Sequence, residues 1–548
     1  MHIYDELQAL FQGELDTSKE TLETFSHDAS LFELRPAVVA RPRDSRDIES
    51  LVTWVVKNKD KNPELSITPR SGGTDMSGGA IGQSVVLDMT THFNQVTKIS
   101  RESARVQPGV YYRDFDKKTI DLGVMLPSYP ASRDLCTLGG MTSNNSGGEK
   151  SLQYGKTDQY VTELKVVLSD GHEYIVKPLT KDELVRKMAQ NDFEGKLYKK
   201  TFELLEEHYD EIQAARPRVS KDSTGYHLWN VWNRETGIFD LTKLFVGAQG
   251  TLGIITDIKV RLVERPEHSG LLVGYLKNID SLGDIITTVL KHQPATFESF
   301  DDNTLWLSFK FFFSFLKKLG FKNWAILALR LIPDGFMLIR GIPQLILMIE
   351  FTGHSVEEVS LKIDEMKKDL EPFPFTYLEK DETEAESQKF WIMRRESFNL
   401  LRSKVKDKHT APFIDDFVVP PENLSEFLPK LRVIIKKYKL LATIAGHMGD
   451  GNFHVIPLMK IEDPHERHKL QPAMKEVNEL VLEYKGSLSG EHNDGMVRGP
   501  WLERMYGPSV FGHMRTVKKL YDPQNIFNPH KKTDADWDFS FSHIRKHF

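Results

Sequence analysis

The sequence predicts an α+β fold with more than one domain, and three observations support this. A chain of 548 residues is too long for one simple core, while 40% hydrophobic and 27% charged residues is an ordinary composition for a globular protein. In the first half, short strand-like runs at 65–69, 84–89 and 162–171 alternate with amphipathic helical patterns such as 46–59. From 270 to 380 the order of strands and helices changes, which indicates a second domain.

This second domain is predicted to hold a layer of strands with two helices. Its apolar patterns are, in order, 270–276 (strand), 281–292 (helix), 295–302 (strand), 345–353 (strand) and 355–370 (helix). Two strand–helix units with a strand between them resemble a split-βαβ (ferredoxin-like) layer. Charge, proline and glycine at 261–270 mark the boundary with the first domain.

The composition limits which binding partners and which cellular compartment we expect for the protein. A net charge of −6 and a pI near 6.4 give no general attraction to phosphate backbones, so nucleic acid is not an expected partner. Cys136 is the single cysteine, which excludes an internal disulfide, a zinc ribbon and an iron–sulfur cluster. Residues 1–20 lack the basic start and apolar run of a signal peptide, so we expect a cytoplasmic protein.

Residues 304–343 interrupt the second domain with a segment rich in phenylalanine, leucine and basic residues. Lysines and arginines break its apolar runs before the ~18 uncharged residues that a membrane span requires. Lys310, Ser314 and Lys317 form one polar stripe of a helix whose other faces carry phenylalanines. We expect this segment to lie peripherally on an anionic membrane surface, on the inner face. The alternative is a helical hairpin packed on the protein's own core.

Three glycine-rich segments, 69–82, 137–148 and 245–256, predict a binding site for an extended, phosphate-bearing cofactor. Glycine permits positive φ and lets backbone N–H groups approach a phosphate closely. The first segment lies between two strand patterns, whereas a Rossmann fingerprint requires a strand, a loop and then a helix. A nicotinamide dinucleotide site of that type is therefore disfavoured. One such segment alone is consistent with an ordinary loop, but three in one domain favour a shared site.

His447 and His454 flank a Gly-Asp-Gly turn in 446–454 and predict a metal site. The apolar runs on either side predict two strands of a hairpin, which would bring the imidazoles together. Glu491 and His492, in a second glycine-flanked segment, add a carboxylate and a further imidazole. Two imidazoles and one carboxylate form a common site for a divalent metal, and zinc, manganese or iron would all tolerate it. A lone histidine would favour a core or surface role, but four such groups favour a site.

Six segments, taken in order, resemble the signature segments of the FAD-linked 2-hydroxyacid dehydrogenases. They are 69–80, 138–148, 247–256, 446–454, 489–495 and 522–529. This family belongs to the vanillyl-alcohol-oxidase superfamily and includes D-lactate dehydrogenase, glycolate oxidase flavoprotein subunits and D-2-hydroxyglutarate dehydrogenase. The resemblance implies a two-lobed FAD-binding domain of the PCMH type and an α+β cap domain over the isoalloxazine ring of the flavin.

The resemblance also implies where the domains and the FAD contacts lie. It implies an FAD-binding domain at 1–265, a cap at 266–490 and a C-terminal segment, 491–548, that returns to the FAD domain and the active site. The first glycine-rich segment has no histidine of the kind that attaches FAD covalently, so we expect non-covalent FAD. The residues expected to contact FAD are Pro69, Arg70, Ser71, Gly72, Gly73, Thr74, Asp75, Ser77, Gly78, Gly139, Gly140, Thr142, Asn145, Ser146, Gly147, Gly148, Gly155, Gly250, Gly253, Ile254, Ile255 and Asn528.

Catalytic and metal-binding roles follow from the same resemblance. It implies His447, His454 and Glu491 as ligands of a divalent metal, zinc in the first place. It implies His492 as the catalytic base. The segment 390–402 resembles the family's Trp-x-x-Arg segment, which implies Arg394 as the partner of the substrate carboxylate, with its neighbour Arg395 as the alternative.

Three residues depart from the family pattern. Gln249 stands where relatives usually have glutamate, which removes a charge beside the expected cofactor but keeps a hydrogen-bonding side chain. Asn493 stands where glycine is usual, and asparagine tolerates positive φ less freely, so the backbone beside His492 is expected to differ. Ile414 falls where relatives specific for larger diacids have a basic residue, which favours a short substrate.

We expect oxidation of a small (D)-2-hydroxyacid, D-lactate to pyruvate in the first place. Hydride would pass to flavin N5 while a metal polarises the hydroxyl and His492 removes its proton. Quinone or another acceptor would take the electrons. Glycolate and D-2-hydroxyglutarate are alternative substrates. A redox-neutral transferase like alkyl-glycerone-phosphate synthase and a non-enzymatic flavin-binding membrane protein are alternatives of other classes.

Overall fold

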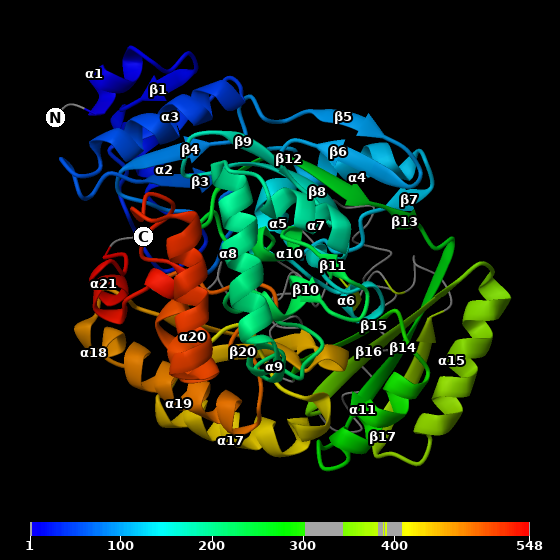
Figure 1. Ribbon diagram of the computed structural model, residues 1–548. Helices are drawn as coiled ribbons and strands as arrows, with labels where there is room; N and C mark the ends of the chain where they lie inside the picture. Colours follow the sequence, from blue (N-terminus) through cyan, green and yellow to red (C-terminus); the bar gives the residue numbers. More distant parts are fainter. Residues whose placement is uncertain (1–2, 302–342, 382–386, 388–389, 392–407, 547–548) are drawn as a thin grey trace, which may run out of the picture.

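The computed structural model describes residues 3–301, 343–381, 387, 390–391 and 408–546. Within them the chain forms two α+β lobes, a cap built on a large sheet, and a C-terminal segment that runs back along the lobes (Figure 1). The two lobes and the cap each have a hydrophobic core. The α+β organisation predicted from the alternating patterns is confirmed.

The first lobe holds a small sheet with helices packed on it. Its elements are α1 (Ile3–Gln8), β1 (Glu14–Asp16), α2 (Lys19–Phe25), β2 (Val38–Arg41), α3 (Ser45–Asn58), β3 (Ile67–Arg70) and β4 (Val85–Asp88). The sheet has the order β1-β2-β4-β3, with β2, β4 and β3 parallel. The side chain of Asp44 accepts the Arg46 N–H and begins α3, whose apolar residues are buried in the core of this lobe.

A five-stranded sheet forms the second lobe. Its elements are β5 (Val96–Ile99), β6 (Ser103–Val106), α4 (Tyr112–Ile120), β7 (Val124–Met125), α5 (Leu138–Asn144), α6 (Ser151–Tyr154), the 3₁₀-helix η1 (Thr157–Gln159), β8 (Val161–Val167), β9 (Glu173–Val176), α7 (Lys181–Met188), α8 (Phe193–Glu207), α9 (Tyr209–Ala214), η2 (Leu228–Asn230), β10 (Trp232–Asn233), β11 (Ile238–Phe239), α10 (Thr242–Phe245), β12 (Ile254–Arg261) and β13 (Val263–Glu264). The sheet order β5-β6-β12-β8-β9 is antiparallel throughout.

The cap begins with the layer that the sequence predicts. Its elements are β14 (His268–Leu276), α11 (Leu282–Lys291), β15 (Thr296–Asp301), β16 (Leu345–Gly353), α15 (Val356–Leu370) and β17 (Phe375–Asp381). The strands are antiparallel in the order β17-β14-β16-β15, and apolar residues of α11 and α15 join the same core as the sheet. The split-βαβ layer is confirmed, with β17 as an additional strand.

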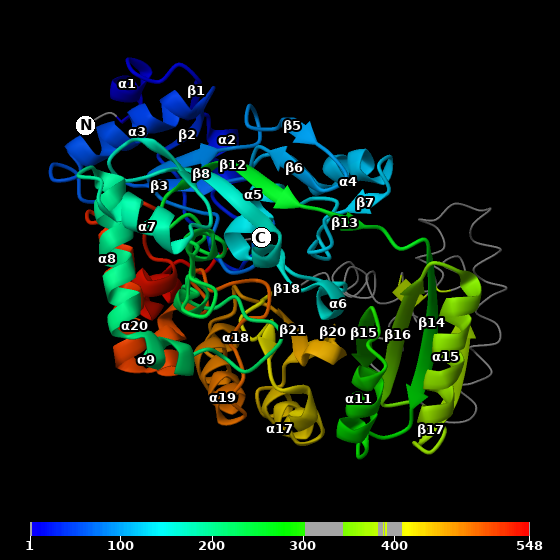
Figure 2. The same ribbon diagram turned by 45° about the vertical axis from the view of Figure 1, so that its right-hand side comes forward.

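The same sheet continues into the segment that carries the two predicted metal-binding histidines. The further elements are β18 (His409–Thr410), β19 (Phe417–Val418), η4 (Pro421–Asn423), α17 (Leu424–Lys437), β20 (Leu441–His447), η5 (Met448–Asp450), β21 (Asn452–Met459), α18 (Pro464–Arg467) and α19 (Leu470–Glu483). Strand β20 pairs with β15 on one edge and with β21 on the other, and Figure 2 shows β21, β20, β15, β16 and β14 side by side. The histidine hairpin is therefore part of the cap sheet.

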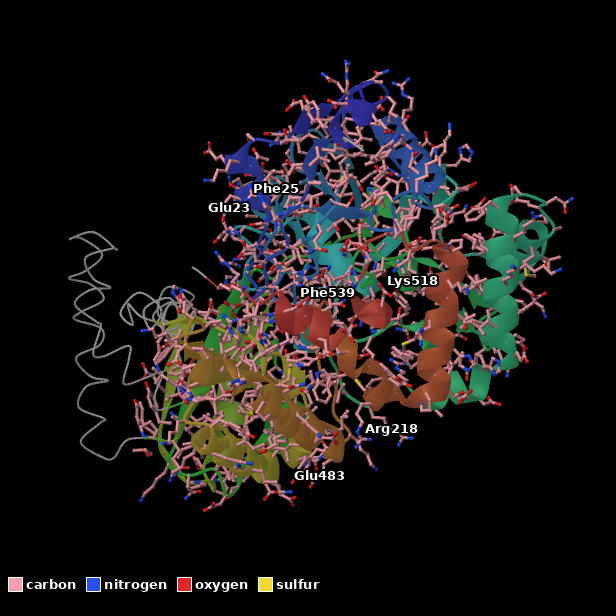
Figure 3. The ribbon with its side chains drawn as sticks, turned by 90° about the vertical axis from the view of Figure 1, so that its left-hand side faces the viewer. Glu23, Phe25, Arg218, Glu483, Lys518 and Phe539 are labelled. Carbon is pink, nitrogen blue, oxygen red and sulfur yellow. The ribbon has the colours of Figure 1, made fainter. Side chains whose placement is uncertain are left out.

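The C-terminal segment packs on both lobes. It contains η6 (Gly499–Trp501), α20 (Leu502–Tyr521), η7 (Lys532–Asp534) and α21 (Trp537–Ser542). Helix α20 lies along α8, and its apolar residues join the core of the second lobe, while Ile526 and Phe527 join that of the first. Figure 3 shows Lys518 on α20, where its ammonium donates to the carbonyls of Thr251 and Phe527 at 2.8 and 3.0 Å.

Two predictions fall on parts of the chain that the structure does not describe. The aromatic and basic segment from 304 to 342 lies outside the described residues, and so do Arg394 and Arg395. Among the residues that are described, no helix is both long and apolar enough to cross a membrane.

Candidate active site

The hairpin of β20 and β21 holds the two histidines at its tip. His447 is the last residue of β20, opposite Asn452, and His454 follows on β21. Gly451 completes the turn with φ +66°, and a Cβ at this position would lie 1.9 Å from the carbonyl oxygen of Val419, so only glycine fits. The imidazole centroids are 5.4 Å apart and the rings are nearly perpendicular. The predicted hairpin is confirmed.

Glu491 lies between the two imidazoles. Its Oε1 is 3.3 Å from Nε2 of His447 and 3.3 Å from Nε2 of His454. The carboxylate of Asp416 accepts the backbone N–H groups of Glu491 and His492, which fixes the segment, and Asp416 itself has φ +66°. A non-glycine residue in this region is strained and requires compensation, which those hydrogen bonds supply. The three predicted ligand groups are thus brought together.

Carboxylates hold the other nitrogen of each histidine. Glu298 on β15 lies 2.6 Å from Nδ1 of His447. Asp415 lies 3.1 Å from Nδ1 of His454 and 2.6 Å from Nδ1 of His492. These contacts assign Nδ1 as the protonated nitrogen and leave Nε2 for an ion or a substrate. Sequence reasoning missed Glu298 and Asp415.

The donor set fits a divalent metal ion. His447 and His454 direct Nε2 toward the Glu491 carboxylate, and each imidazole has an acidic partner behind it. Metal-ligating histidines in proteins usually donate their second N–H to a carboxylate or a carbonyl in this way. Asp416 and His492 also place a donor atom within 4.8 Å of the His454 and Glu491 donors. The arrangement can therefore hold an ion with a position left for a substrate oxygen.

Acidic neighbours change the proton affinity of this cluster. Burial opposes protonation of His454, but Asp415 and Glu491 outweigh it and raise the pKa of His454 to about 10. Burial likewise opposes a charge on His492, yet Asp416 and Asp415 raise the pKa of its imidazole. Burial disfavours the ionised Glu491, but Lys221 and His447 hold its pKa well below the usual range. A raised pKa makes the neutral imidazole of His492 a stronger base, and it is this deprotonated form that can accept a proton.

The three glycine-rich segments meet between the two lobes. In the first, the Asp75 carboxylate accepts N–H groups of Ser77 and Gly79 and the Asn144 amide at 2.7 Å. In the third, the Gln249 amide donates to the Ser77 hydroxyl at 3.0 Å. Asp75 and Ser77 therefore shape the first segment and join it to the other two. The strand–loop–strand order predicted around the first segment is also confirmed by β3 and β4.

Asn528 and Arg70 hold the first segment from the side. The Asn528 amide donates to the carbonyls of Gly79 and Gln249 at 2.8 and 2.7 Å. The Arg70 guanidinium donates to the His27 carbonyl at 2.9 Å and lies over the ring of Phe25, which Figure 3 labels at the edge of the first lobe. The described contacts of both side chains are thus with the protein itself.

The second segment offers a bound FAD a hydrogen-bond donor that has no partner among the described residues. It begins at Thr137, whose hydroxyl caps α5, and ends that helix at Asn145, with φ +48°. The Asn145 Nδ2 is buried without an acceptor among the described residues, so a donor is left for a ligand. A Cβ at Gly148 would lie 2.2 Å from the Tyr129 carbonyl, and one at Gly147 would lie 3.4 Å from Glu491 Oε2. The second segment therefore lies directly against the metal-ligand set.

The remaining residues expected to contact FAD lie in or beside these three segments. Those at intermediate exposure are Pro69, Ser71, Gly72, Gly73, Thr74, Gly140 and Gly155, and the buried ones are Gly78, Gly139, Thr142, Ser146, Gly250, Gly253, Ile254 and Ile255.

The two substitutions next to the expected cofactor are accommodated. Gln249 accepts the Gly495 N–H at 2.8 Å through Oε1, in addition to its contact with the first segment. Asn493 adopts φ +66°, as a glycine could, and its amide donates to the Gly247 carbonyl at 2.9 Å. The hydrogen bond of the asparagine side chain therefore offsets the strain of a positive φ beside His492.

Two family profiles match most of this chain. Residues 36–177 match the FAD binding domain, and residues 265–532 match the C-terminal domain of FAD linked oxidases. The chain belongs to the FAD-linked oxidase family. The match supports FAD as the cofactor of this family member, which is consistent with the three converging glycine-rich segments.

Relatives with assigned names oxidise different hydroxyacids, as their names say. The chain is 27% identical to D-2-hydroxyglutarate dehydrogenase of Pantoea ananatis over 95% of its length, but spans about half (50%) of that relative. It is 27% identical to glycolate oxidase subunit GlcD of Bacillus subtilis, covering 95% of this chain and 94% of the relative. It is 25% identical to D-lactate dehydrogenase of Anaerostipes hadrus, covering 93% of each.

Solved structures of this family's fold cover nearly the whole chain. p-Cresol methylhydroxylase with a bound substrate matches with a TM-score of 0.66 at 14% identity, covering 98% of both chains. An alkyldihydroxyacetonephosphate synthase matches with a TM-score of 0.65 at 17% identity, covering 96% of this chain and 85% of that one. The predicted PCMH-type FAD-binding fold with an α+β cap is confirmed.

Proposed function

We propose that the protein is an FAD-dependent dehydrogenase of a small (D)-2-hydroxyacid, with D-lactate as the substrate and pyruvate as the product. The observation that carries the proposal is the convergence of His447, His454 and Glu491, with His492 beside them, against the second glycine-rich segment. A 2-hydroxyacid has a hydroxyl that a metal can bind and a C–H bond from which a flavin can take hydride.

The residues of the site have separable tasks in this reaction. A divalent metal held by His447, His454 and Glu491 would supply a Lewis acid for the hydroxyl oxygen, and bound FAD would supply the two-electron acceptor. His492 takes the hydroxyl proton at Nε2, since Asp415 holds its Nδ1. Asp415 then stabilises the imidazolium that forms. Loss of that proton and of hydride from the α-carbon converts the hydroxyacid into a 2-oxoacid.

The preference for a monocarboxylate substrate rests on the side chain next to Asp415, the acid that holds His454 and His492. Ile414 precedes Asp415 and is 2% exposed in the cap core. An apolar residue here offers no partner to a second carboxylate, so a monocarboxylate is favoured over D-2-hydroxyglutarate. Arg394 remains our proposed partner for the single carboxylate, on the sequence alone.

Anaerobic flavin reduction tests the proposal directly. The purified protein is mixed without oxygen with D-lactate, L-lactate, glycolate or D-2-hydroxyglutarate, and the visible flavin absorbance is followed. We expect D-lactate to bleach the flavin fastest. Faster bleaching by glycolate or D-2-hydroxyglutarate would make that compound the proposed substrate instead. No bleaching by any hydroxyacid would contradict the reaction itself and favour a redox-neutral or non-enzymatic role.

FAD itself is proposed to be non-covalent. Acid precipitation should release the yellow colour into the supernatant, because the first glycine-rich segment offers no histidine for attachment. Flavin that stays in the pellet would contradict this.

We further propose that residues 304–343 dock the protein on an anionic membrane, where a quinone could take the electrons. The support is composition: six basic residues among many aromatic ones, each worth about 1 kcal/mol near such a surface. A protein lacking 306–340 should keep hydroxyacid-driven flavin reduction but no longer co-sediment with anionic liposomes. Unchanged liposome binding by the shortened protein would contradict docking through this segment.

A further inference from the structure

Lys221 is a buried ammonium group at the back of the metal-ligand set. Its side chain is 1% exposed, and it lies in the segment that follows α9. Its Nζ is 3.1 Å from Oε2 of Glu491, 3.1 Å from the Gly148 carbonyl and 3.5 Å from Oδ2 of Asp450. These three acceptors come from the C-terminal segment, the second glycine-rich segment and the turn of the histidine hairpin. One side chain thus joins the three segments that build the site.

Because of the contact with Lys221, the two oxygens of the Glu491 carboxylate have different partners. Oε1 faces Nε2 of both His447 and His454, and Oε2 faces Lys221. A carboxylate free to rotate about its last bond would present either oxygen, or neither, to the imidazoles. The ammonium removes this freedom, because a buried carboxylate loses a charge-assisted hydrogen bond if it turns away.

Asp450, the second acidic partner of Lys221, is held in turn. The Ser220 hydroxyl donates to its Oδ1 at 2.7 Å, so Oδ2 is directed toward Lys221. Two carboxylates and the Gly148 carbonyl thus hold the buried ammonium. The position of Lys221 is therefore defined before any metal binds.

We propose that Lys221 is a positioning residue that orients the Glu491 carboxylate for metal binding. The inference rests on the metal site of the proposed function, and it adds a residue that touches neither the ion nor the substrate. A side chain with this role should set the metal affinity, whereas FAD keeps the contacts of the other two glycine-rich segments.

Lys156 provides a matched control. It is also buried, at 5% exposed, and its ammonium donates to the Gly490 carbonyl at 2.7 Å, next to Glu491 in the chain. Its other acceptors are the Asp222 carbonyl and the Ser223 hydroxyl, and no ion pair joins it to a carboxylate within the described part of the chain. Lys156→Met therefore removes a buried ammonium that contacts the backbone beside Glu491, without removing a partner of the Glu491 side chain.

The test measures metal affinity on FAD-loaded protein. Zn²⁺ and Co²⁺ dissociation constants are compared for wild type, Lys221→Met, Lys221→Arg and Lys156→Met, together with FAD content and melting temperature. We expect Lys221→Met to weaken the metal by about 10–100-fold, the usual effect of losing a partner of a ligand, at unchanged FAD content. Lys221→Arg should recover most of the affinity, and Lys156→Met should change it several-fold less than Lys221→Met.

The outcomes separate positioning from a general loss of structure. Wild-type affinity in Lys221→Met, or an equal loss in Lys156→Met, overturns the inference. If Lys221→Met fails to fold, the double variant Lys221→Met with Asp450→Asn replaces it, because this variant removes one buried negative charge along with the ammonium. The proposal requires that the double variant still binds the metal weakly. Wild-type metal affinity in the double variant would overturn the proposal as well. If the wild-type protein binds no metal, both the proposed metal site and the positioning role of Lys221 are contradicted.

A different result identifies a failure of the proposed function alone. If the wild type binds metal and loses it in Lys221→Met, yet no hydroxyacid bleaches its flavin, the positioning role stands and the reaction assignment falls.

Discussion

Two of the groups that the described residues form each combine two imidazoles with one carboxylate, and they differ in whether they have the features of a built site. The first is the set of His447, His454 and Glu491 in the interior. The second is His208, Glu211 and His513 on the surface, where α9 meets α20, with donor atoms within 4.8 Å of one another. The donor types are alike, but the two groups differ in orientation and surroundings.

Ring orientation separates the two groups first. In the interior the imidazoles of His447 and His454 are at 86° to each other, so that both Nε2 atoms face one carboxylate oxygen. At the surface the rings of His208 and His513 stack, with centroids 4.1 Å apart, and the carboxylate is an exposed partner of His513 at 3.1 Å. The surface imidazoles therefore lack the perpendicular arrangement that turns Nε2 of both His447 and His454 toward one carboxylate oxygen.

Burial and outer partners separate them further. Glu491 is 5% exposed, and acidic groups on β15 and in the segment before β19 hold the remote nitrogens of its histidines. The carboxylate of Glu211 is 43% exposed. Water and salt weaken an exposed pair, whereas a buried set keeps its geometry only when every charge is compensated. A short distance between donor atoms is therefore not enough to identify a metal site. The residues that hold the other nitrogens of the histidines distinguish such a site from a surface ion pair.

The largest expected effect is loss of the interior ligands. His447→Ala should abolish stoichiometric metal binding and hydroxyacid-driven flavin reduction while the FAD spectrum persists, because the glycine-rich segments are separate from the hairpin. Metal analysis and anaerobic flavin bleaching measure both. His513→Ala is the matched surface control and should leave both unchanged; metal loss in the control would assign the ion to the surface group instead.

Removing the base should separate catalysis from metal binding. His492→Ala should retain the metal and FAD and slow flavin reduction by about 10²–10⁴-fold, the usual contribution of general base catalysis. Stopped-flow bleaching gives the rate and metal analysis gives the ion content. A variant that lost the ion as well would show that His492 is a ligand rather than the base.

The outer carboxylates should matter by an intermediate amount. Asp415→Asn leaves a side chain of the same shape but removes the negative charge behind His454 and His492, so metal affinity should fall about 10–100-fold. Glu298→Gln should act similarly through His447 alone. Metal dissociation constants of both variants test this, and unchanged values would remove the physical basis of the comparison with the surface group.

Metal binding at the interior site should strengthen with rising pH. The pKa of His454 is raised to about 10, so below that pH an incoming metal must displace a proton from its imidazole. The pKa of Glu491 is lowered, so its carboxylate does not compete for a proton in the neutral range. One displaced proton gives up to about tenfold tighter binding per pH unit. Titrations between pH 6 and 8.5 that gave a flat affinity would contradict this.

The smallest effect is expected at the surface group. Glu211→Gln removes an exposed ion pair with His513, which should change the free energy of unfolding by about 0–1 kcal/mol. Thermal melting of the FAD-loaded protein measures it. A much larger loss of stability would mean that this group is a structural centre after all.

Local patterns predicted the elements well, because periodicity and capping act within a few residues. The helix at 46–59, the strands around the first glycine-rich segment and the two helices of the cap follow from apolar spacing alone. Pairing between distant strands has no such signal. The contact of β15 with β20, which makes the histidine hairpin part of the cap sheet, joins strands more than a hundred residues apart in the chain.

The candidate site was predictable where chemistry and glycine coincide and not where a polar side chain comes from a distant strand. Two glycine-flanked motifs that can be recognised in the sequence contain His447, His454, Glu491 and His492. Glu298 gives a fainter signal, an acid inside a strand whose six residues are all buried. A buried acid requires a partner, but nothing local identifies which one.

The pairing of Thr68 with Asn528 has a consequence for the time course of synthesis. Their side chains share a hydrogen bond across 460 positions of the chain, and Ile526 and Phe527 complete the core of the first lobe. At about 5–20 residues per second, a ribosome needs on the order of half a minute to a minute and a half to make the intervening chain. During that interval the nascent first lobe exposes apolar surface that only the late residues cover. Chaperone capture should therefore begin once the first lobe has emerged, persist through this interval and end once residue 528 has emerged.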